Sequence, residues 1–339
     1  MRLTLEPRTL RFREPLATAF GTLERRDVLL VGITDEAGLT GWGEASPLEP
    51  YDGVSLDAVR DALEAYRPVL ERGERMLPGD RLDACRAAAD LPQALAGIDL
   101  ALWDLRGRRE GRPVAALLAR DAAREIEVNA TIGGLDRAGA TAHASRAARA
   151  GYRAIKVKVG VGDDAGRVAA VRAAAGPQMA LRLDANGAWR PGEAIAAIGT
   201  LAPAGLELVE EPSRGIEAIR KVREHVAVRV AMDETAAIPG ALMSRAADAV
   251  CLKISRSGGI SALLADAVAV RTSGAEAYLA SSFDGPLGIA AALHAAAALA
   301  PLPACGLATL GLFADLDDPF PPRGGRIAVP TGPGLGVQW

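Results

Sequence analysis

The sequence predicts an α/β protein: a modified (β/α)7β barrel of the TIM type, preceded by a smaller α+β domain. Two observations indicate this. From about Arg124 onward, short β-branched runs alternate with alanine-rich helical stretches, whereas residues 1–45 resemble strands and residues 55–119 resemble helices. Strands separated by helices form parallel sheets, most simply a closed barrel. An open doubly wound sheet is the alternative, but Gly133-Gly134 after the first strand does not match its phosphate-binding fingerprint.

The α+β capping domain is expected to span residues 1–120. Its strands are expected at residues 3–10, 27–35 and 39–45, with turn chemistry at 35–38. In its helical part, apolar residues at a spacing of three to four predict one buried helix face: Leu95, Ile98, Leu102 and Leu105. Residues 314–339, rich in Pro and Gly, are expected to return to this domain through a strand at 326–329.

The barrel domain is expected to span residues 121–313. Seven strands alternate with helical stretches, at residues 126–132, 154–159, 179–184, 206–210, 228–233, 249–254 and 276–280.

Composition and charge exclude several classes of protein. The formal charge of −3 gives no electrostatic footprint for nucleic acid or an anionic membrane. The longest apolar run, residues 288–300, is too short to span a bilayer, and the N-terminus lacks a signal-peptide core. Three widely spaced cysteines, an odd number, fit a reducing cytosol. We therefore expect a cytoplasmic protein with a small-molecule partner; whether it forms a homo-oligomer is left open.

Charged residues recur where the predicted strands end. Lys156 and Lys158 alternate with apolar residues, so both project from one face of a strand. The next four strands end in acidic or basic residues at steps of 26, 23 and 20 residues, each about one βα unit. Catalytic residues of a βα barrel lie at the carboxyl ends of its strands. One mouth should therefore hold Asp184 with Asn186, Glu210, Asp233 and Lys253.

This set of residues suits proton abstraction next to a carboxylate. Three carboxylates in one mouth would repel each other unless a cation neutralised them. Carboxylate oxygens without His or Cys suit a hard cation, so we expect Mg²⁺, with Mn²⁺ as a substitute. A buried Lys beside that cation has a lowered pKa and can act as a base.

Each signal alone has an ordinary structural explanation. A Lys-x-Lys strand is usually a solvated sheet face, and Asp184 or Asp233 could cap the helix that follows it. The joint spacing, one polar group per strand, favours function. His294 lies on an apolar alanine-rich stretch, where a structural histidine is expected rather than a base.

The chain resembles the enolase superfamily, in the muconate-lactonizing subgroup. The resemblance rests on residues 41–45 (Gly-Trp-Gly-Glu-Ala), residues 101–107, and the Lys-x-Lys, Asp-x-Asn, Glu-Glu-Pro, Asp-Glu and Lys-x-x-x-x-Gly-Gly motifs in family order. The use of a Lys or His base with Mg²⁺ is a known property of that superfamily. The resemblance implies three metal ligands and three catalytic lysines. The ligands would be Asp184, Glu210 and Asp233; Lys158 and Lys253 would face opposite sides of the substrate α-carbon, and Lys156 would help hold its carboxylate.

Within the subgroup, residues 128–131 and 304–309 look most like o-succinylbenzoate synthases of menaquinone biosynthesis, which are dehydrating lyases. By that resemblance Lys158 would be the base, and Lys253 would stabilise the enolate. Residues 253–259 depart from the usual synthase sequence. Dipeptide epimerases and N-acylamino acid racemases are the alternatives, and Asp284 could then meet a substrate ammonium. A catalytically silent barrel that acts as a binding protein is the alternative outside enzymes.

Two loops are predicted to close over the barrel mouth and select the substrate, at residues 18–22 and 47–53. The expected substrate-binding residues are Phe20 and Tyr51 on these loops, with Asn186, Ser282 and Asp284 at strand ends.

Overall fold

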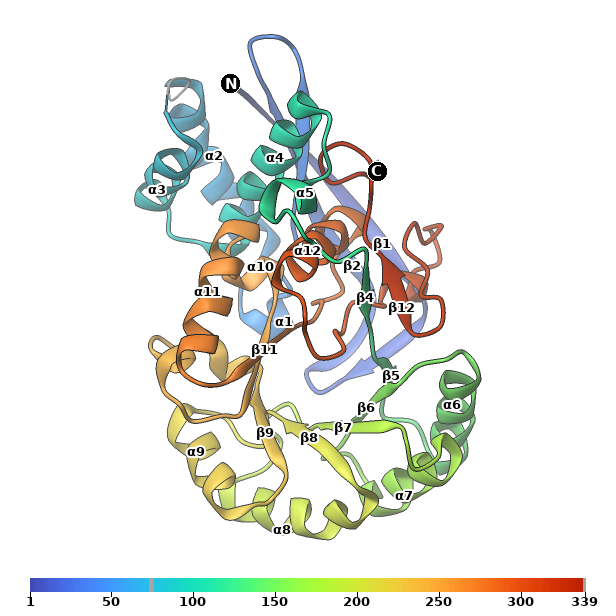
Figure 1. Ribbon diagram of the computed structural model, residues 1–339. Coiled ribbons are helices and arrows are strands. Elements are labelled where there is room, and N and C mark those ends of the chain that lie inside the picture. Colours follow the sequence, from blue (N-terminus) through green and yellow to red (C-terminus); the bar gives the residue numbers. More distant parts are fainter. Residues whose placement is uncertain (73–75, 338–339) are drawn as a thin grey trace.

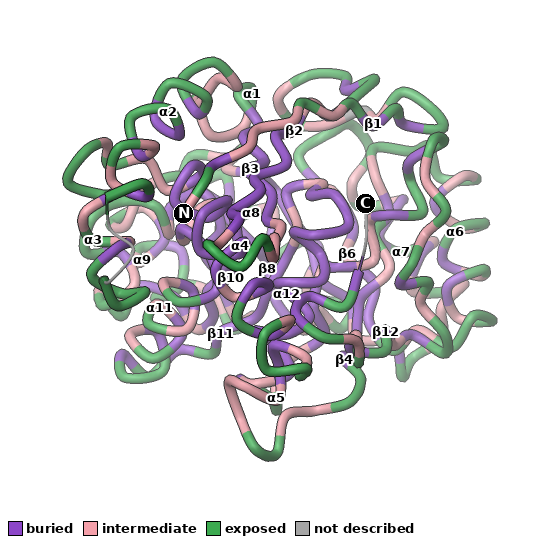
Figure 2. The backbone as a smooth tube through the Cα atoms, turned by 90° about the horizontal axis from the view of Figure 1, so that it is seen from above, coloured by how far each residue is buried: buried purple, intermediate pink, exposed green. Residues whose placement is uncertain are grey.

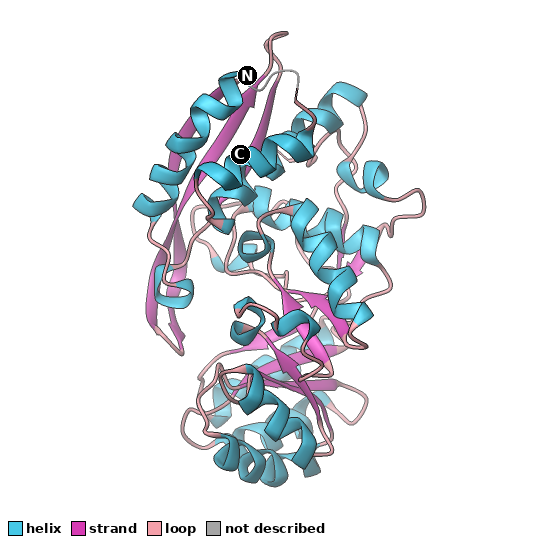
Figure 3. Ribbon diagram, turned by 90° about the vertical axis from the view of Figure 1, so that its left-hand side faces the viewer, coloured by secondary structure: helices cyan, strands magenta, loops and turns pink. Residues whose placement is uncertain are grey.

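The computed structural model describes residues 1–72 and 76–337, and it places a helical and antiparallel part above a barrel (Figure 1). The N-terminal sheet has the order β1-β2-β3 and its helices follow in sequence. Figure 3 shows the long strands of this sheet as a layer separate from the barrel strands. The elements are β1 (Arg2–Thr18), β2 (Gly21–Thr34), β3 (Thr40–Ala45), α1 (Glu49–Asp52), α2 (Leu56–Arg72), α3 (Pro78–Ala88), α4 (Pro92–Glu110) and α5 (Val114–Leu118).

Two glycines let β3 lie directly against α4. A Cβ atom on Gly41 would come within 2.3 Å of the carbonyl oxygen of Ala101, and one on Gly43 within 2.2 Å of that of Gly97. No side chain fits at either position. The predicted apolar face of α4 is confirmed: Leu95, Ile98, Leu102 and Leu105 are all buried in the core of this part of the chain.

The predicted barrel is confirmed. Seven parallel strands form one sheet in the order β11-β10-β9-β8-β7-β6-β5. They are β5 (Ala130–Ile132), β6 (Ala154–Lys158), β7 (Ala180–Asp184), β8 (Leu206–Glu210), β9 (Arg229–Met232), β10 (Ala249–Leu252) and β11 (Glu276–Leu279). The helices between them are α6 (Arg137–Arg149), α7 (Asp164–Ala175), α8 (Pro191–Leu201), α9 (Ile216–His225), α10 (Ile254–Ser257), α11 (Ile260–Thr272) and α12 (Pro286–Leu299).

Residues 305–306 close the barrel as its short eighth strand. Gly306 bridges Ala280 at the end of β11, and Cys305 bridges Val128 just before β5. Backbone hydrogen bonds join both sides: the N–H of Gly306 donates to Leu279 at 2.8 Å, and that of Asn129 donates to Cys305 at 3.0 Å. With eight strands in the ring, β6 and β10 lie opposite each other.

Two predicted elements differ in the structure. The strand expected at 126–132 is two strands, because β4 (Glu125–Glu127) pairs with β12 (Arg326–Ala328) and only β5 joins the barrel. Between β4 and β5 the backbone passes from pairing with β12 to pairing with β6, and at this point the N–H of Val128 donates to the carbonyl of Gly325. Between β9 and β10 the connection is two 3₁₀ turns, Glu234–Ala237 and Ala241–Met243, instead of an α-helix.

The C-terminal segment contacts both parts of the molecule. Its strand β12 pairs with β4, the N–H of Ala314 donates to Arg11 on β1, and the N–H of Leu335 donates to Asp104 on α4 at 2.8 Å. The predicted domain boundaries at 120/121 and 313/314 stay predictions.

Helix α12 lies at the centre of the molecule and is buried on nearly all sides (Figure 2). His294 on this helix is structural, as predicted: its Nδ1 accepts from the N–H of Ala115 at 3.1 Å and its Nε2 contacts the carbonyl of Leu335 at 3.2 Å. The three cysteines are free and buried. Across the described residues, no helix combines the length and apolar character needed to cross a membrane.

Candidate active site

Strand register brings the predicted charged residues together at the carboxyl ends of the barrel strands. Lys158, Asp184 and Glu210 are the last residues of β6, β7 and β8, and their Cα atoms pair directly across the sheet. Asp233 follows β9 immediately, and Lys253 follows β10. The three carboxylates thus occupy consecutive strands, and the strands of Lys158 and Lys253 flank them.

A cavity of about 190 Å³ opens over these strand ends. Nine of the eleven predicted site residues line it: Phe20, Tyr51, Lys156, Lys158, Asp184, Asn186, Asp233, Lys253 and Ser282. Glu210 and Asp284 do not, since both are buried behind its wall.

The Lys-x-Lys pair is held by the carboxylates. The ammonium of Lys156 lies 2.9 Å from both Asp184 Oδ2 and Glu210 Oε1. Lys158 donates to Asp184 Oδ2 at 2.7 Å and to Asn186 Oδ1 at 2.5 Å. Lys158 is the more exposed of the two, with 26% of its side chain accessible against 12% for Lys156. It is therefore the lysine better placed to reach a bound molecule.

Lys253 is held from the opposite side by a tyrosine of the capping part. Its ammonium donates to Asp233 Oδ2 at 2.5 Å and to the Tyr51 hydroxyl at 2.6 Å. That hydroxyl donates to Asp233 Oδ1 at 2.8 Å and accepts from Arg256 at 2.6 Å. Sequence reasoning did not identify Arg256. Arg256 lies on the short helix α10, three residues after Lys253. That spacing is the signal in the sequence that could have identified it as a site residue.

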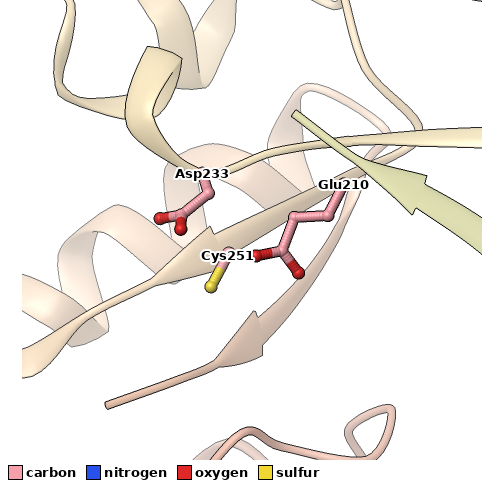
Figure 4. A group of neighbouring side chains, drawn as sticks. All are labelled: Glu210, Asp233 and Cys251. Carbon is pink, nitrogen blue, oxygen red and sulfur yellow. The ribbon is translucent and has the colours of Figure 1, made fainter. Parts of the chain in front are cut away.

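Glu210 lies deepest in the cluster. Its Oε2 accepts from the Tyr278 hydroxyl at 2.7 Å, which sequence reasoning also missed. Figure 4 shows Glu210 and Asp233 converging with Cys251, and the ligand atoms of these three lie within 4.8 Å of one another. The next residue, Glu211, accepts from the N–H groups of Asp233 and Thr235 at 2.8 and 3.0 Å and so fixes the end of the neighbouring strand.

The donor set fits a hard divalent cation. Asp184, Glu210 and Asp233 are buried, come from consecutive strands, and offer only oxygen atoms. Burial and the carboxylates of Asp233 and Glu210 raise the pKa of the Cys251 thiol well above its ordinary value, which disfavours the thiolate that a metal would need.

The carboxylates and lysines shift each other's pKa values. Burial lowers the pKa of Lys156, but Asp184 and Glu210 outweigh it, so the net shift is upward. The pKa of Lys253 is raised in the same way, against burial, chiefly by Asp233. Burial opposes ionisation of Asp184, yet Lys156 and Lys158 lower its pKa. The predicted lowering of a lysine pKa requires the charge of a cation, because the carboxylates act in the other direction.

The two predicted loops meet at the cavity. The expected loop at 18–22 is the two-residue turn of a long hairpin, since β1 runs to Thr18 and β2 starts at Gly21. Phe20 at this turn packs against Tyr51, with ring centroids 5.7 Å apart. The second loop contains the short helix α1 and carries Tyr51.

Asp284 does not reach the cavity. Its Oδ2 accepts from Ser281 Oγ at 3.0 Å and from the N–H of Ser282 at 3.1 Å, which folds the turn back on itself. Burial raises the pKa of Asp284, against the charge of Arg26 and the hydrogen bonds from Ser281 and Ser282, which lower it. An ammonium group in the cavity would therefore not meet this carboxylate.

Arg26 and Glu44, which sequence reasoning did not select as site residues, join the capping part to the barrel. The guanidinium of Arg26 donates to the carbonyls of Pro47 at 2.6 Å, Ser46 at 3.3 Å and Phe283 at 3.3 Å. Glu44 accepts from the N–H groups of Gly285 and Gly288 at the start of α12.

Two hydroxyls on the cavity wall, Ser282 Oγ and Thr309 Oγ1, are buried and have no hydrogen-bond partner within the described part of the chain. They follow neighbouring strands, because the N–H of Ser281 donates to the carbonyl of Gly306 at 3.0 Å. Both lie on the far side of the barrel from β7 and β8. They are available to a polar, uncharged group of a ligand.

Two models of known protein families match this chain. A family model described as "Enolase C-terminal domain-like" matches residues 139–339, and one described as "Mandelate racemase / muconate lactonizing enzyme, N-terminal domain" matches residues 2–119. The chain belongs to the enolase superfamily. The family resemblance predicted from the motifs is thereby confirmed, and two regions of the chain match its two domains.

Among curated members of the superfamily, the chain is 30% identical to the L-Ala-D/L-Glu epimerase of Bacillus subtilis, over 96% of this chain and 92% of that protein. It is also 30% identical to muconate cycloisomerase 1 of Rhodococcus opacus, over 96% and 91%. The dipeptide epimerase of Enterococcus faecalis, solved with Mg and the dipeptide L-Leu-L-Tyr, superposes with a TM-score of 0.87 at 27% identity, covering 100% of this chain and 99% of that one. These relatives are epimerases and cycloisomerases, so the narrower resemblance to o-succinylbenzoate synthases stays a prediction.

Proposed function

We propose that the protein is a Mg²⁺-dependent racemase or epimerase, which moves a proton at the carbon next to a substrate carboxylate. The observation that carries this is the position of Lys158 and Lys253. They stand at the ends of strands on opposite sides of the eight-stranded barrel, and both line one cavity. A racemase needs an acid and a base on opposite faces of one carbon, and two lysines so arranged can supply them.

Asp184, Glu210 and Asp233 would hold the Mg²⁺ ion. When bound, Mg²⁺ supplies positive charge that holds the substrate carboxylate and stabilises the negative charge that develops as the proton leaves. The residues that hold it have only oxygen donors. The Mg in the Enterococcus faecalis relative supports this choice of metal.

Charge balance explains how one lysine becomes a base. The three carboxylates and the ammonium groups of Lys156, Lys158 and Lys253 balance each other when all are ionised. With one divalent cation and one substrate carboxylate added, neutrality returns when one lysine loses its proton. A low-dielectric site favours that neutral arrangement.

Inversion takes two proton transfers, one on each face of the substrate carbon, and they involve two different protons. A neutral Lys158 takes the α-proton on its side and becomes an ammonium. The ammonium of Lys253 gives a proton to the other side of the same carbon, which inverts the centre. Lys156, held between Asp184 and Glu210, keeps a positive charge near the substrate carboxylate. Reversal of the two roles returns the opposite enantiomer.

The substrate's remaining part is proposed to be uncharged. Apart from the cluster of lysines and metal ligands, the described residues that line the cavity carry no charged side chain. Phe20, Leu48 and Phe283 supply apolar wall, and the free hydroxyls of Ser282 and Thr309 suit an amide. An N-acylated amino acid meets these conditions better than a dipeptide with a free ammonium.

Dehydration of a cyclohexadiene carboxylate is the second candidate. Among the described residues that line the cavity, none outside the proposed metal ligands offers a carboxylate for a substrate ammonium, which fits that substrate equally. In that reaction Lys158 takes the α-proton and hydroxide leaves from the adjacent carbon, so the proton is not returned.

One panel of substrates tests these proposals. Purified protein with Mg²⁺ in D₂O is given both enantiomers of N-acylamino acids, dipeptides, and the cyclohexadiene precursor of menaquinone. Proton NMR follows loss of the α-proton and formation of product. We expect exchange and inversion with N-acylamino acids. Dehydration of the precursor without inversion of any amino acid would favour the second candidate, and no reaction with any member would refute proton transfer.

A binding protein without activity is the remaining alternative. It predicts that Mg²⁺ has no measurable affinity and that the Asp184→Asn variant behaves like the parent protein. Calorimetric titration with Mg²⁺ on both proteins separates the two readings.

A further inference from the structure

We propose that Glu234, in the turn after β9, is a positioning residue for Lys158 and acts through Asn186. The inference rests on the proposed proton transfer. Lys158 donates to Asn186 Oδ1 at 2.5 Å, and the Nδ2 of the same amide donates to Glu234 Oε1 at 3.1 Å. The three side chains form one continuous chain of hydrogen bonds from the turn to the lysine.

Glu234 determines which end of the amide faces the lysine. The Oε1 oxygen of Glu234 accepts from the amide, so the amide turns its NH₂ group toward Glu234. Its oxygen then faces Lys158, whose ammonium only donates. With an uncharged amide in place of the carboxylate, both orientations of Asn186 become acceptable at that end, and only Lys158 itself still selects the oxygen.

The backbone of Asn186 supports this role. Its φ of 47° lies in the left-handed region, which asparagine tolerates better than most residues. The N–H of Asn186 donates to Asp184 Oδ1 at 3.1 Å, and the next N–H, of Gly187, donates to Glu211 at 2.7 Å. The residue is thus fixed on both sides, and its side chain has little freedom except rotation of the amide.

The contacts of Glu234 are few for a buried carboxylate. It is 8% exposed, and its Oε2 has no hydrogen-bond partner within the described residues. Arg214 approaches Oε1 only to 3.5 Å. Arg214 lies over Gly187, since a Cβ atom on that glycine would come within 2.3 Å of the Arg214 side chain. A buried oxygen without a partner costs stability, so a role in structure alone explains Glu234 poorly.

The chain of hydrogen bonds reaches only one of the two proposed bases. Lys253 has other hydrogen-bond partners, the Tyr51 hydroxyl and Asp233 Oδ2, and Glu234 contributes to its raised pKa only through charge, as the smallest of the causes. A defect transmitted through Asn186 should therefore slow proton transfer on one face of the substrate. A defect in metal binding, by contrast, should slow both faces.

The experiment compares the two enantiomers separately. Initial rates of α-proton exchange in D₂O are measured for each enantiomer of one N-acylamino acid. The Lys158→Ala and Lys253→Ala variants identify which enantiomer depends on which lysine. For Glu234→Gln we expect a fall of about tenfold for the enantiomer that depends on Lys158, and a change within about twofold for the other. Tyr51→Phe, the matched control, should show the opposite selectivity.

Asn186→Gly removes the amide and tolerates the left-handed backbone, so it should reproduce the selective loss. It also guards against a folding defect in the Glu234 variant. Equal slowing of both enantiomers, or no slowing in either variant, would overturn the proposal.

Crystal structures of the parent protein and of Glu234→Gln give a readout that does not depend on activity. We expect the contact between Lys158 Nζ and Asn186 Oδ1 to lengthen in the variant. An unchanged contact refutes the positioning role. If the parent protein exchanges neither enantiomer, the proposed function fails, and these structures alone decide the role of Glu234.

Discussion

Replacing Glu44 with Gln should remove a measurable part of the pH dependence of stability. Glu44 is buried, and burial followed by the charge of Asp284 raises its pKa from 4.5 to about 7, against hydrogen bonds from Ser46, Gly285 and Gly288. The folded protein thus holds this proton more tightly than the unfolded chain does. Protonation of Glu44 stabilises the fold, and that contribution is complete below pH 4.5 and lost as the pH rises through 7.

The size of the effect follows from the two pKa values. A difference between 4.5 and about 7 corresponds to about 3 kcal/mol of unfolding free energy. Glutamine has a similar shape and does not titrate, and its one oxygen can keep the shorter of the two backbone hydrogen bonds, the one from the N–H of Gly285. The variant should therefore lack this loss of stability between pH 4.5 and 7.

Urea unfolding followed by tryptophan fluorescence, at pH values from 5 to 8, measures the difference. The exposed Glu49→Gln, at the start of α1 five residues after Glu44, is the matched control and should parallel the parent protein. Parallel curves for the parent protein and Glu44→Gln would refute the reasoning, since they would mean that Glu44 binds its proton equally in both states.

Three further predictions follow from contacts in the structure. Tyr51→Phe removes a hydroxyl from the ammonium of Lys253, so exchange of the enantiomer that depends on this lysine should fall about thirtyfold, equivalent to about 2 kcal/mol; equal loss for both enantiomers would contradict it. Asp99→Ala removes the carboxylate that accepts from the N–H and the Oγ hydroxyl of Ser261 at the start of α11. The free energy of unfolding in urea should fall by about 2 kcal/mol, and an unchanged midpoint would refute this cap. Asp184→Asn removes a proposed ligand charge and should weaken Mg²⁺ binding at least about tenfold by calorimetry; equal affinity would exclude it as a ligand.

The charged strand ends could be predicted because two simple regularities determine them. Side chains alternate along a strand, and the carboxyl ends of parallel strands share one edge. These rules place Lys156, Lys158, Asp184 and Asp233 around one mouth, and the register of β6, β7 and β8 agrees. The closed barrel follows from the alternation of strands and helices.

Other features depend on contacts between distant segments, which no local pattern encodes. Arg256 meets a hydroxyl 205 positions earlier in the chain, on Tyr51. The predicted strand at 126–132 divides because its two ends pair with different segments, while its apolar pattern is continuous. Asp284 is at the predicted strand end, but its own turn, through Ser281 and Ser282, directs the carboxylate away from the cavity.

The carboxylate of Asp99 has a consequence for exchanging parts between relatives. It lies on α4 in the N-terminal part, yet it caps a barrel helix through Ser261, and Gly259 leaves room for it, since a Cβ there would come within 2.5 Å of Asp99. Helix α11 follows the strand end that carries Lys253. A chimaera with the N-terminal part of another enzyme would leave this helix uncapped unless the donor supplied an acceptor at the same place. Substrate loops from a relative are therefore better introduced alone, with the native α4 kept in place, than together with the relative's own α4.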